Sequence, residues 1–362
     1  MEHDASFIRS ADYLIEMGPG AGRAGGEVIY QGKVSELAQA KHSLTYQMFQ
    51  AQRVTPATKE KKKGKLFGMS GAFANNLKNI EVNFYSRQIT AITGVSGSGK
   101  SSLIKEVLYR SSLQSRPVNC TSINGMEQFS EVLLIDQEIL TQNRLSTPAT
   151  YTGITELMKT LFSKTEFAKE AGLKKADFSY QNKNGKCTTC GGHGKLKTSM
   201  DFMSDIWLTC DTCKGMRYNS TLLACKYRGR SIGEVLRMTV QEAMEFFEDK
   251  ILLEKLELLQ RVGVGHLLLG QAGNTWSGGE AQRLKLAKSM LEKRKGATLY
   301  LFDEPSTGLH YFDILRLIGV FESLIEGGDT VLFIEHNRTL IESADGVITL
   351  GPGSGENGGR VM

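Results

Sequence analysis

Short apolar runs with the character of buried strands recur along the chain. Residues 67–93 alternate apolar and polar positions, which predicts strands joined by a turn at Asn75 and Asn76. Compact apolar runs typical of parallel strands occupy residues 89–92, 131–136, 297–304 and 330–334. Apolar residues recur at helical intervals in residues 102–109 and across most of 231–270. The pattern predicts an α/β fold, which residues 138–275 interrupt with a segment of different character.

A glycine-rich loop joins one of these strands to a helix. Residues 94–101 read GVSGSGKS and lie between the apolar run 89–92 and the helical pattern 102–109, which is the context that the G-x-x-x-x-G-K-[ST] motif requires. Glycines let backbone N–H groups converge on a phosphate, and the following helix presents the positive end of its dipole. Lys100 is predicted to reach the β- and γ-phosphates of a nucleoside triphosphate, and Ser101 to hold Mg²⁺. The predicted nucleotide-binding residues here are Gly94, Val95, Ser96, Gly97, Ser98, Gly99, Lys100, Ser101 and Ser102. The alternative is a glycine- and serine-rich turn that matches by chance.

Polar residues stand at the ends of the later strands. Asp303 and Glu304 end the run 297–304, where Asp303 is suited to Mg²⁺ and Glu304 to the attacking water; a pair of acids that caps the next turn is the alternative. His336 follows the run 330–334, at the strand end where open α/β sheets bind ligands, so a γ-phosphate contact is expected. Gln137 follows the run 131–136, and a contact with Mg²⁺ or water and an ordinary turn residue both remain open.

Four of the six cysteines form two C-x2-C pairs. Cys187, Cys190, Cys210 and Cys213 have the spacing C-x2-C-x19-C-x2-C, which predicts a tetrahedral Zn²⁺ site. A full set of four thiolates leaves no open coordination position, so the zinc is expected to be structural. His193 could compete as a ligand, but the fourth cysteine makes it unnecessary.

Basic residues crowd the same region. Lys195, Lys197, Lys214 and Arg217 are predicted to contact the phosphates of a nucleic acid, and interleaved aromatic residues could stack on its bases. The alternative is that the aromatics form the small core of a zinc module and the lysines its solvated face. A second glycine-containing anion site follows, since Ser277, Gly278 and Gly279 precede a helix that starts at Glu280.

Length and composition bound the possibilities. The 362 residues, 40% hydrophobic and 23% charged, are typical of a globular protein with two domains or one large domain with an insertion. No apolar run approaches the roughly 18–20 residues of a membrane span, and the N-terminus lacks a signal-peptide pattern, so a cytoplasmic protein without a membrane partner is predicted. The net charge of +5 does not by itself establish a polyanionic partner.

An internal repeat links the two ends of the chain. The segment from Glu2-His3-Asp4 and the segment from 335–337 both contain EH[DN], SAD, an apolar strand, GPG and a GG turn. The repeat predicts that the chain begins with the tail of one nucleotide-binding unit and contains a second, nearly whole one. The lysine run in residues 59–65 is most simply a linker between them, with a basic arm that touches phosphate as the alternative.

These motifs together resemble the ATP-binding cassette (ABC) ATPases. GVSGSGKS, Gln137, SGGEAQR, LYLFDEPSTGLH and His336 occur in that family's order. More closely, NNLKNI, TPATYTG, the four-cysteine insertion, CDTCKGMRYN and ADGVITLGPG are similar to the C-terminal half of the UvrA family of DNA-repair excinuclease subunits. The resemblance covers essentially the whole chain.

The resemblance implies a role for each motif. Glu304 would be the general base, His336 and Gln137 would sense the γ-phosphate, and the signature residues Ser277, Gly278, Gly279 and Glu280 would contact ATP bound to a different cassette. It implies ATP, Mg²⁺ and Zn²⁺ as cofactors, and double-stranded DNA and a second cassette as partners, the latter either in a homodimer or in a missing N-terminal half. His3 would be the switch histidine of the first cassette, whose UvrB contact domain would be absent from this chain.

The expected organisation follows from the resemblance. It comprises the tail of a truncated first cassette at 1–37, a basic linker at 38–66, an ATP-binding core at 67–150 and 276–362, and a signature and insertion domain at 151–275. Trp276, where the family usually has a small aliphatic residue, and the segment 138–146 depart from the UvrA pattern. These departures indicate a divergent paralogue, for which a role in drug resistance is an alternative to DNA repair. A non-hydrolysing fragment that binds zinc and nucleic acid is a separate alternative.

Overall fold

The computed structural model describes residues 5–19, 25–51, 64–137, 143–200, 203–292 and 295–362. His3, most of the lysine run and the first residues of the segment 138–146 therefore lie outside the described residues. The chain divides into two compact units, Met1–Gln137 with Lys293–Met362 (unit 1) and Glu138–Glu292 (unit 2). Within the described residues, no helix is long and apolar enough to cross a membrane.

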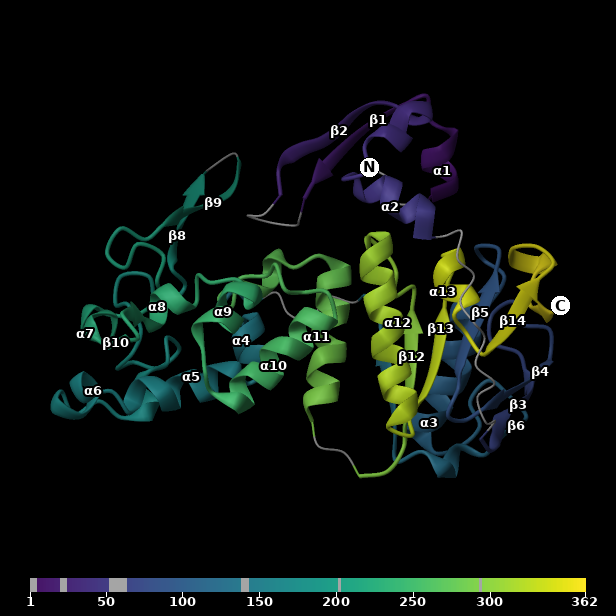
Figure 1. The fold of residues 1–362 in the computed structure, drawn as a ribbon. Coiled ribbons are helices and arrows are strands. Elements are labelled where there is room, and N and C mark those ends of the chain that lie inside the picture. The colour runs from purple at the N-terminus through teal and green to yellow at the C-terminus, as the bar shows by residue number, and fades with distance from the viewer. Residues whose placement is uncertain (1–4, 20–24, 52–63, 138–142, 201–202, 293–294) are drawn as a thin grey trace. The chain divides into compact units, whose positions relative to one another are not determined.

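A six-stranded sheet forms the centre of unit 1 (Figure 1). Its order is β15-β14-β5-β13-β12-β7, with all neighbours parallel except β14 and β15. The strands are β5 (Ile89–Gly94), β7 (Glu131–Ile135), β12 (Thr298–Asp303), β13 (Thr330–Ile334), β14 (Gly346–Gly351) and β15 (Arg360–Val361). Every residue of β13 is buried, as the continuous apolar pattern predicts for a strand covered on both faces.

Helices and a second sheet cover the central strands. The antiparallel sheet has the order β4-β3-β6, and its buried Phe67 and Phe84 share a core with Leu103 and Val107 of the helix that follows the phosphate loop. α12 packs against β13. The elements are β3 (Leu66–Ala72), β4 (Ile80–Tyr85), β6 (Ser122–Asn124), the π-helix η3 (Ser102–Tyr109), α3 (Arg110–Gln114), α12 (Tyr311–Glu326) and α13 (Arg338–Glu342).

The N-terminal part of unit 1 is a small α/β module. Strands β1 (Tyr13–Gly18) and β2 (Glu27–Lys33) pair in antiparallel fashion, and α1 (Ala5–Ser10) and α2 (Leu44–Ala51) flank them in the chain. β1 and β14 occupy equivalent positions of the internal repeat, since each follows the sequence SAD and ends at the first glycine of GPG. The repeated sequence thus forms a strand in both copies.

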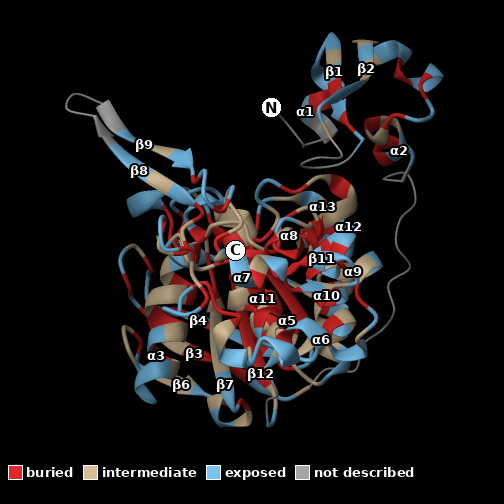
Figure 2. Ribbon diagram, turned by 90° about the vertical axis from the view of Figure 1, so that its left-hand side faces the viewer, coloured by how far each residue is buried: buried red, intermediate tan, exposed pale blue. Residues whose placement is uncertain are grey.

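Unit 2 consists of short helices and small hairpins. Several helices begin where a side chain caps them: Thr147, Ser231, Thr239 and Ser277 each accept an N–H bond in a capping box. The helices are α4 (Pro148–Tyr151), α5 (Ile154–Ser163), α6 (Glu166–Glu170), α7 (Ser220–Ala224), α8 (Ile232–Val235), α9 (Val240–Phe246), α10 (Lys250–Arg261) and α11 (Gly278–Leu291). The hairpins are β8 (Lys195–Met200) with β9 (Met203–Thr209), and β10 (Lys226–Tyr227) with β11 (Arg230–Ser231). Figure 2 shows exposed and intermediate residues along the described part of the β8–β9 hairpin.

The unit boundaries differ from the expected domain boundaries. The structure divides after Gln137 and after Glu292, whereas the sequence motifs placed the divisions near residues 150 and 275. The reason is packing: α4 and α11 contact each other, and α11 also contacts α10, so the signature helix belongs to the compact body of unit 2.

Candidate functional site

The phosphate loop lies at the carboxyl end of β5. Gly94 and Gly99 have φ values of +138° and +106°, which L side chains rarely adopt. A Cβ at Gly94 would approach the Leu350 carbonyl oxygen to 2.1 Å, and one at Gly99 would approach Leu77 Cδ2 to 2.7 Å. Both positions therefore require glycine, for backbone conformation and for space.

Two distant segments brace this loop. The Asn76 amide donates to the Gly97 and Gly355 carbonyls at 2.9 and 3.0 Å. The N–H groups of Gly355 and Gly359 donate to the carbonyls of Gly97 and Ser98 at 3.0 Å each. The sequence suggested a turn at Asn76, but the role of the C-terminal GPGSGENGG segment in holding the loop is visible only in the structure.

Lys100 is almost fully buried under the loop. Its Nζ donates to the carbonyls of Gly94 and Val95, both at 2.9 Å. Burial lowers the pKa of Lys100, while the nearby carboxylates of Glu304 and Asp303 oppose that shift. The ammonium thus lies within the electrostatic reach of the two acids that end β12.

The predicted catalytic residues meet at the carboxyl edge of the sheet. Gln137 follows β7, and its Nε2 donates to the Glu304 carbonyl at 3.3 Å. The His336 Nε2, just beyond β13, lies 4.0 Å from Glu304 Oε1. Glu304 adopts a φ of +47°, a rare conformation for a residue with a side chain, and its N–H donates to the Ile334 carbonyl at 3.0 Å. The backbone bond to Ile334 and the side-chain bond from Gln137 therefore hold Glu304 near Gln137 and His336.

Glu335 is a site residue that the sequence analysis missed. Its carboxylate is only 3% exposed and accepts N–H bonds from Ser306 at 3.0 Å, His336 at 2.6 Å and Asn337 at 3.1 Å. It ties the loop after β12 to the loop after β13. The signal was present in the repeated EH[DN] sequence, in which only the histidine was interpreted.

The donors and acceptors at this edge fit a magnesium–nucleotide complex. The buried Ser98 Oγ makes no hydrogen bond among the described residues, and the glycine-rich loop leaves no room for Cβ atoms at Gly94 and Gly99. Asp303 supplies a carboxylate and Ser101 a hydroxyl, the oxygen ligands that Mg²⁺ prefers. The residues present are thus suited to bind both the nucleotide phosphates and Mg²⁺.

The signature residues lie in unit 2 at the start of α11. The Ser277 Oγ accepts the Glu280 N–H at 3.2 Å, and the Ser277 N–H donates to Glu280 Oε2 at 2.7 Å. Although burial favours a neutral carboxyl, hydrogen bonds from His266 and from the Ser277 N–H lower the pKa of Glu280. Ser277 itself is exposed. The preceding Trp276 packs edge-on against Tyr151, with ring centroids 6.2 Å apart.

The four predicted zinc ligands converge in unit 2. Cys187, Cys190, Cys210 and Cys213 are buried, and their sulfur atoms all lie within 4.8 Å of one another. The Cys187–Cys210 and Cys190–Cys213 Sγ pairs are 4.0 and 3.6 Å apart. Four thiolates about 2.3 Å from a tetrahedral Zn²⁺ would have similar separations, so the cluster fits zinc. The group found among the described residues consists of these four cysteines.

The tentative DNA contacts divide into two kinds. Lys195, Lys197 and Lys214 are exposed, and Lys197 pairs with Asp205 at 2.7 Å. Arg217 is only 7% exposed, and its guanidinium donates to the carbonyls of Arg144 at 3.1 Å and Gly270 at 3.0 Å. This placement does not support Arg217 as a DNA contact, because its charge is used inside the unit.

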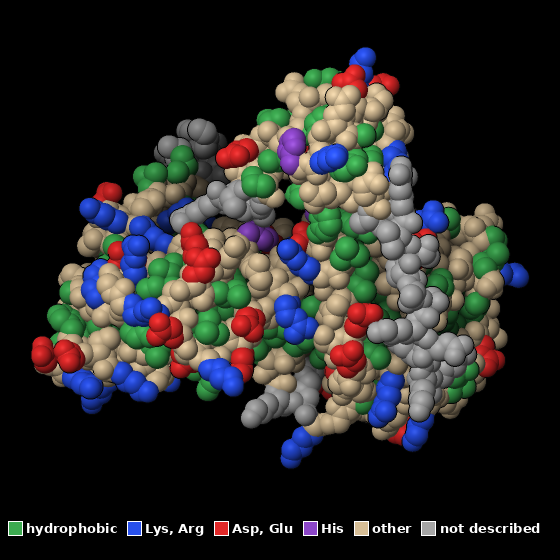
Figure 3. Space-filling view, in the orientation of Figure 1, with side chains coloured by type: hydrophobic (Ala, Val, Ile, Leu, Met, Phe, Trp, Pro, Cys, Tyr) green, Lys and Arg blue, Asp and Glu red, His purple; other side chains and the backbone are tan. Residues whose placement is uncertain are grey.

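The aromatic residues of this region mostly form a core. Phe178, Tyr180 and Tyr218 are at most 1% exposed, which favours the alternative that they stabilise the module and argues against base stacking by these rings. On the face in Figure 3, Lys and Arg side chains of unit 2 alternate with Asp and Glu side chains.

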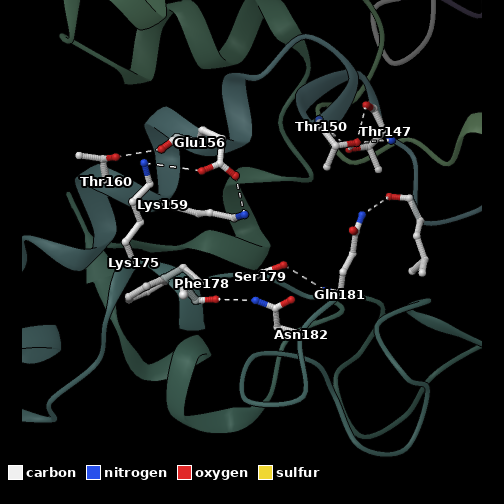
Figure 4. Close-up of polar contacts among 12 residues, drawn as sticks. Thr147, Thr150, Glu156, Lys159, Thr160, Lys175, Phe178, Ser179, Gln181 and Asn182 are labelled. Atoms are coloured by element: carbon white, nitrogen blue, oxygen red, sulfur yellow. Dashed lines mark hydrogen bonds and ion pairs between the residues drawn. The ribbon is translucent and has the colours of Figure 1, made fainter.

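Unit 2 also contains a polar cavity of about 220 Å³. Figure 4 shows Glu156 at its edge, held by Lys159 at 2.7 Å and by Lys175 at 3.6 Å. The hydrogen bond from Lys159 lowers the pKa of Glu156. The lining residues are Thr150, Gly153, Thr155, Glu156, Lys159, Ser179, Tyr180 and Gln181. Within the lining, the carboxylate of Glu156 offsets the charge of Lys159.

The phosphate loop, the strand-end acids and the signature helix are characteristic of nucleotide-binding cassettes. Residues 77–307 match the family described as "ABC transporter", and this match covers more than half of the chain. The chain therefore belongs to the ATP-binding cassette family. The predicted α/β fold class of this family is confirmed.

Individual proteins resemble the chain over its whole length. UvrABC system protein A of Clostridium perfringens is 41% identical over 371 residues, which cover 100% of this chain and 40% of that protein. The protein of the same name from Thermus thermophilus is 42% identical and is covered to 39%. The crystal structure of UvrA2 from Deinococcus radiodurans matches with a TM-score of 0.92 at 37% identity, covering 100% of this chain and 44% of that one. The predicted resemblance to UvrA proteins is confirmed, and the chain spans about two fifths of the length of these relatives.

Proposed function

We propose that the chain is an ATP-hydrolysing, DNA-binding protein of UvrA type that acts in nucleotide excision repair together with a second cassette. One observation carries the proposal. Lys100, Asp303, Glu304 and His336 lie along one edge of a single sheet, in a chain 41–42% identical over its whole length to UvrABC system protein A.

Each residue would have a distinct part in hydrolysis. Lys100 and the loop N–H groups would bind the β- and γ-phosphates, and Ser101 and Asp303 would hold Mg²⁺, which neutralises charge on the transferred phosphoryl group. Glu304, whose side chain is 47% exposed, would accept a proton from the attacking water. His336 would contact the γ-phosphate, and Gln137 would orient the water.

Two parts of unit 2 would complete the function. The exposed start of α11, with Ser277, Gly278 and Gly279, would face ATP bound by a second cassette, because its N–H groups and helix dipole attract an anion. The four cysteines would hold a structural Zn²⁺. Lys195, Lys197 and Lys214 would contribute phosphate contacts to double-stranded DNA.

The test is the ATPase rate as a function of protein concentration, with and without duplex DNA. A site shared between two chains predicts a rate that rises more steeply than linearly and changes with DNA, and Glu304→Gln should abolish hydrolysis while nucleotide still binds. A rate per chain that does not depend on concentration would contradict the shared site. Failure to bind ATP at any concentration would contradict the proposed nucleotide site itself.

Trp276 favours a second candidate. It stands in place of the small aliphatic residue that the UvrA pattern implies and is buried against Tyr151, so the chain would be a divergent UvrA-like protein that acts in drug resistance. A salt titration of DNA binding separates the candidates, because phosphate contacts cause a steep loss of affinity as salt rises. Weak binding with no salt dependence would favour the second candidate.

A further inference from the structure

Lys105 forms an ion pair inside the nucleotide site that no motif pointed to. It lies on η3, five residues after Lys100. Its Nζ is 2.7 Å from Asp303 Oδ2 and 4.0 Å from Asp136 Oδ2. The exposed side-chain fractions are 29% for Lys105, 8% for Asp136 and 22% for Asp303. One ammonium therefore lies between two shielded carboxylates.

The backbone brings these three charges together. Asp136 follows β7 and Asp303 ends β12, and the two strands pair in parallel with Ile135 opposite Phe302. The acids thus stand at adjacent strand ends, directly before Gln137 and Glu304. The start of η3 follows the phosphate loop, which places Lys105 over the same edge. A lysine at this position touches the carboxylate that the proposed function assigns to Mg²⁺.

Two cations would compete for Asp303. The ammonium already takes one carboxylate oxygen at hydrogen-bond distance, and like charges repel strongly where burial keeps the effective dielectric low. Asp136 offers Lys105 a second acceptor, to which the partly buried ammonium can shift while it stays paired with a carboxylate. A phosphate-bearing ligand adds negative charge at this edge and so offsets the repulsion between the cations.

We propose that Lys105 is a positioning residue that makes Mg²⁺ binding depend on nucleotide. Without nucleotide, its ion pair with Asp303 prevents that carboxylate from binding Mg²⁺. When Mg²⁺ arrives with ATP, Lys105 shifts toward Asp136 and releases Asp303. The inference rests on the proposed function, since it takes Asp303 as the residue that holds Mg²⁺. It goes further by assigning a role to a residue outside the predicted site. A purely structural ion pair would tie η3 to β12 without affecting divalent-ion binding.

The experiment measures metal binding directly, independent of turnover. Binding of Mn²⁺, a probe for Mg²⁺, is followed by electron paramagnetic resonance without nucleotide, and the Mg²⁺ dependence of binding of a fluorescent ATP analogue is measured in parallel. Lys105→Met should bind Mn²⁺ about tenfold more tightly without nucleotide, because the competing charge is gone. Lys105→Arg should resemble the parent.

A second variant has the opposite predicted sign. Asp136→Asn removes the alternative acceptor, so the Mg²⁺ concentration that half-saturates nucleotide binding should rise severalfold. Arg110→Gln is the matched control, since Arg110 follows on the next turn and pairs with Glu106 at 2.9 Å. It removes the same charge without touching either aspartate and should leave both titrations unchanged.

The outcomes separate this inference from the proposed function. One outcome is that the parent binds the magnesium–nucleotide complex, and that the Lys105 and Asp136 variants bind Mn²⁺ and Mg²⁺ with the same affinity as the parent. Lys105 would then have only a structural role, and the inference would be wrong. A lower melting temperature without altered metal binding would likewise mean that the ion pair only stabilises the fold. If the parent binds no nucleotide at any Mg²⁺ concentration, the nucleotide site and the inference both fail.

Discussion

Replacement of Glu335 by Gln tests whether a buried carboxylate holds the nucleotide edge together. The side chain is 3% exposed and accepts three N–H groups, from Ser306, His336 and Asn337. Hydrogen bonds to a charged group each contribute about 1.5–3 kcal/mol. Gln keeps the shape and one oxygen but turns an NH₂ group toward at least one donor. A loss of about 2–4 kcal/mol from the unfolding free energy of unit 1 is therefore expected.

The assay can separate the two units. Trp207 and Trp276 are the protein's two tryptophans, and both belong to unit 2. Tryptophan fluorescence thus reports the unfolding of unit 2, whereas far-UV circular dichroism reports both units. Glu335→Gln should lower the midpoint of the unit 1 transition, which is seen by circular dichroism but not by fluorescence, by about 5–15 °C. The midpoint of the unit 2 transition, which is seen by tryptophan fluorescence, should not change.

A matched control fixes the meaning of the result. Glu342 on α13 is exposed and pairs with Arg338 at 2.6 Å, so Glu342→Gln makes the same chemical change on the surface. Its expected effect is below about 0.5 kcal/mol. Equal effects of Glu335→Gln and Glu342→Gln would refute the reasoning, because the buried N–H bonds would then contribute nothing beyond a surface charge.

Three further predictions concern other parts of the fold. Gly319→Ala in α12 should stabilise unit 1 by about 0.5–1 kcal/mol in the same melts, because an added Cβ meets no atom within 4 Å and alanine lowers the entropy lost on folding; destabilisation would mean that the helix needs glycine there. Removal of metal by a chelator, or Cys213→Ser, should unfold the zinc region and change Trp207 fluorescence, since structural zinc contributes about 10–16 kcal/mol of binding free energy; an unchanged spectrum would argue against a metal. A hydrogen bond from Lys226, with others from Ser231, lowers the pKa of Glu234 to about 2. Because the folded pKa lies below the unfolded value, this carboxylate stabilises unit 2 above about pH 5 and loses that effect as the pH falls toward 2. Glu234→Gln should thus cost about 1–2 kcal/mol at pH 7, discounted because the side chain is one-third exposed, and this cost should shrink below about pH 5 and disappear as the pH falls through about 2. A difference that does not change with pH would contradict this origin.

The sequence by itself determined the main strands, the glycine-rich loop and the set of clustered cysteines. The apolar runs at 131–136, 297–304 and 330–334 are strands, and the loop 94–101 does join a strand to a helix. The cysteine spacing also predicted correctly which four sulfurs converge. These features are local: the period of apolar residues sets the element, and short fixed spacings set a turn or a metal clip.

Only the tertiary structure decided which distant residues share the site. Lys105 belongs to no motif, and the motifs that contain Asn76 and Glu335 do not indicate that Asn76 binds the phosphate loop or that Glu335 accepts the Ser306 N–H. Arg217 shows the converse, because its type and neighbours suggested a phosphate contact but burial directs its guanidinium to two carbonyls. The reason is physical: parallel strands bring residues separated by 160 or more positions, such as Asp136 and Asp303, to adjacent strand ends. Such proximity depends on the order of strands in the sheet, which local sequence patterns do not encode.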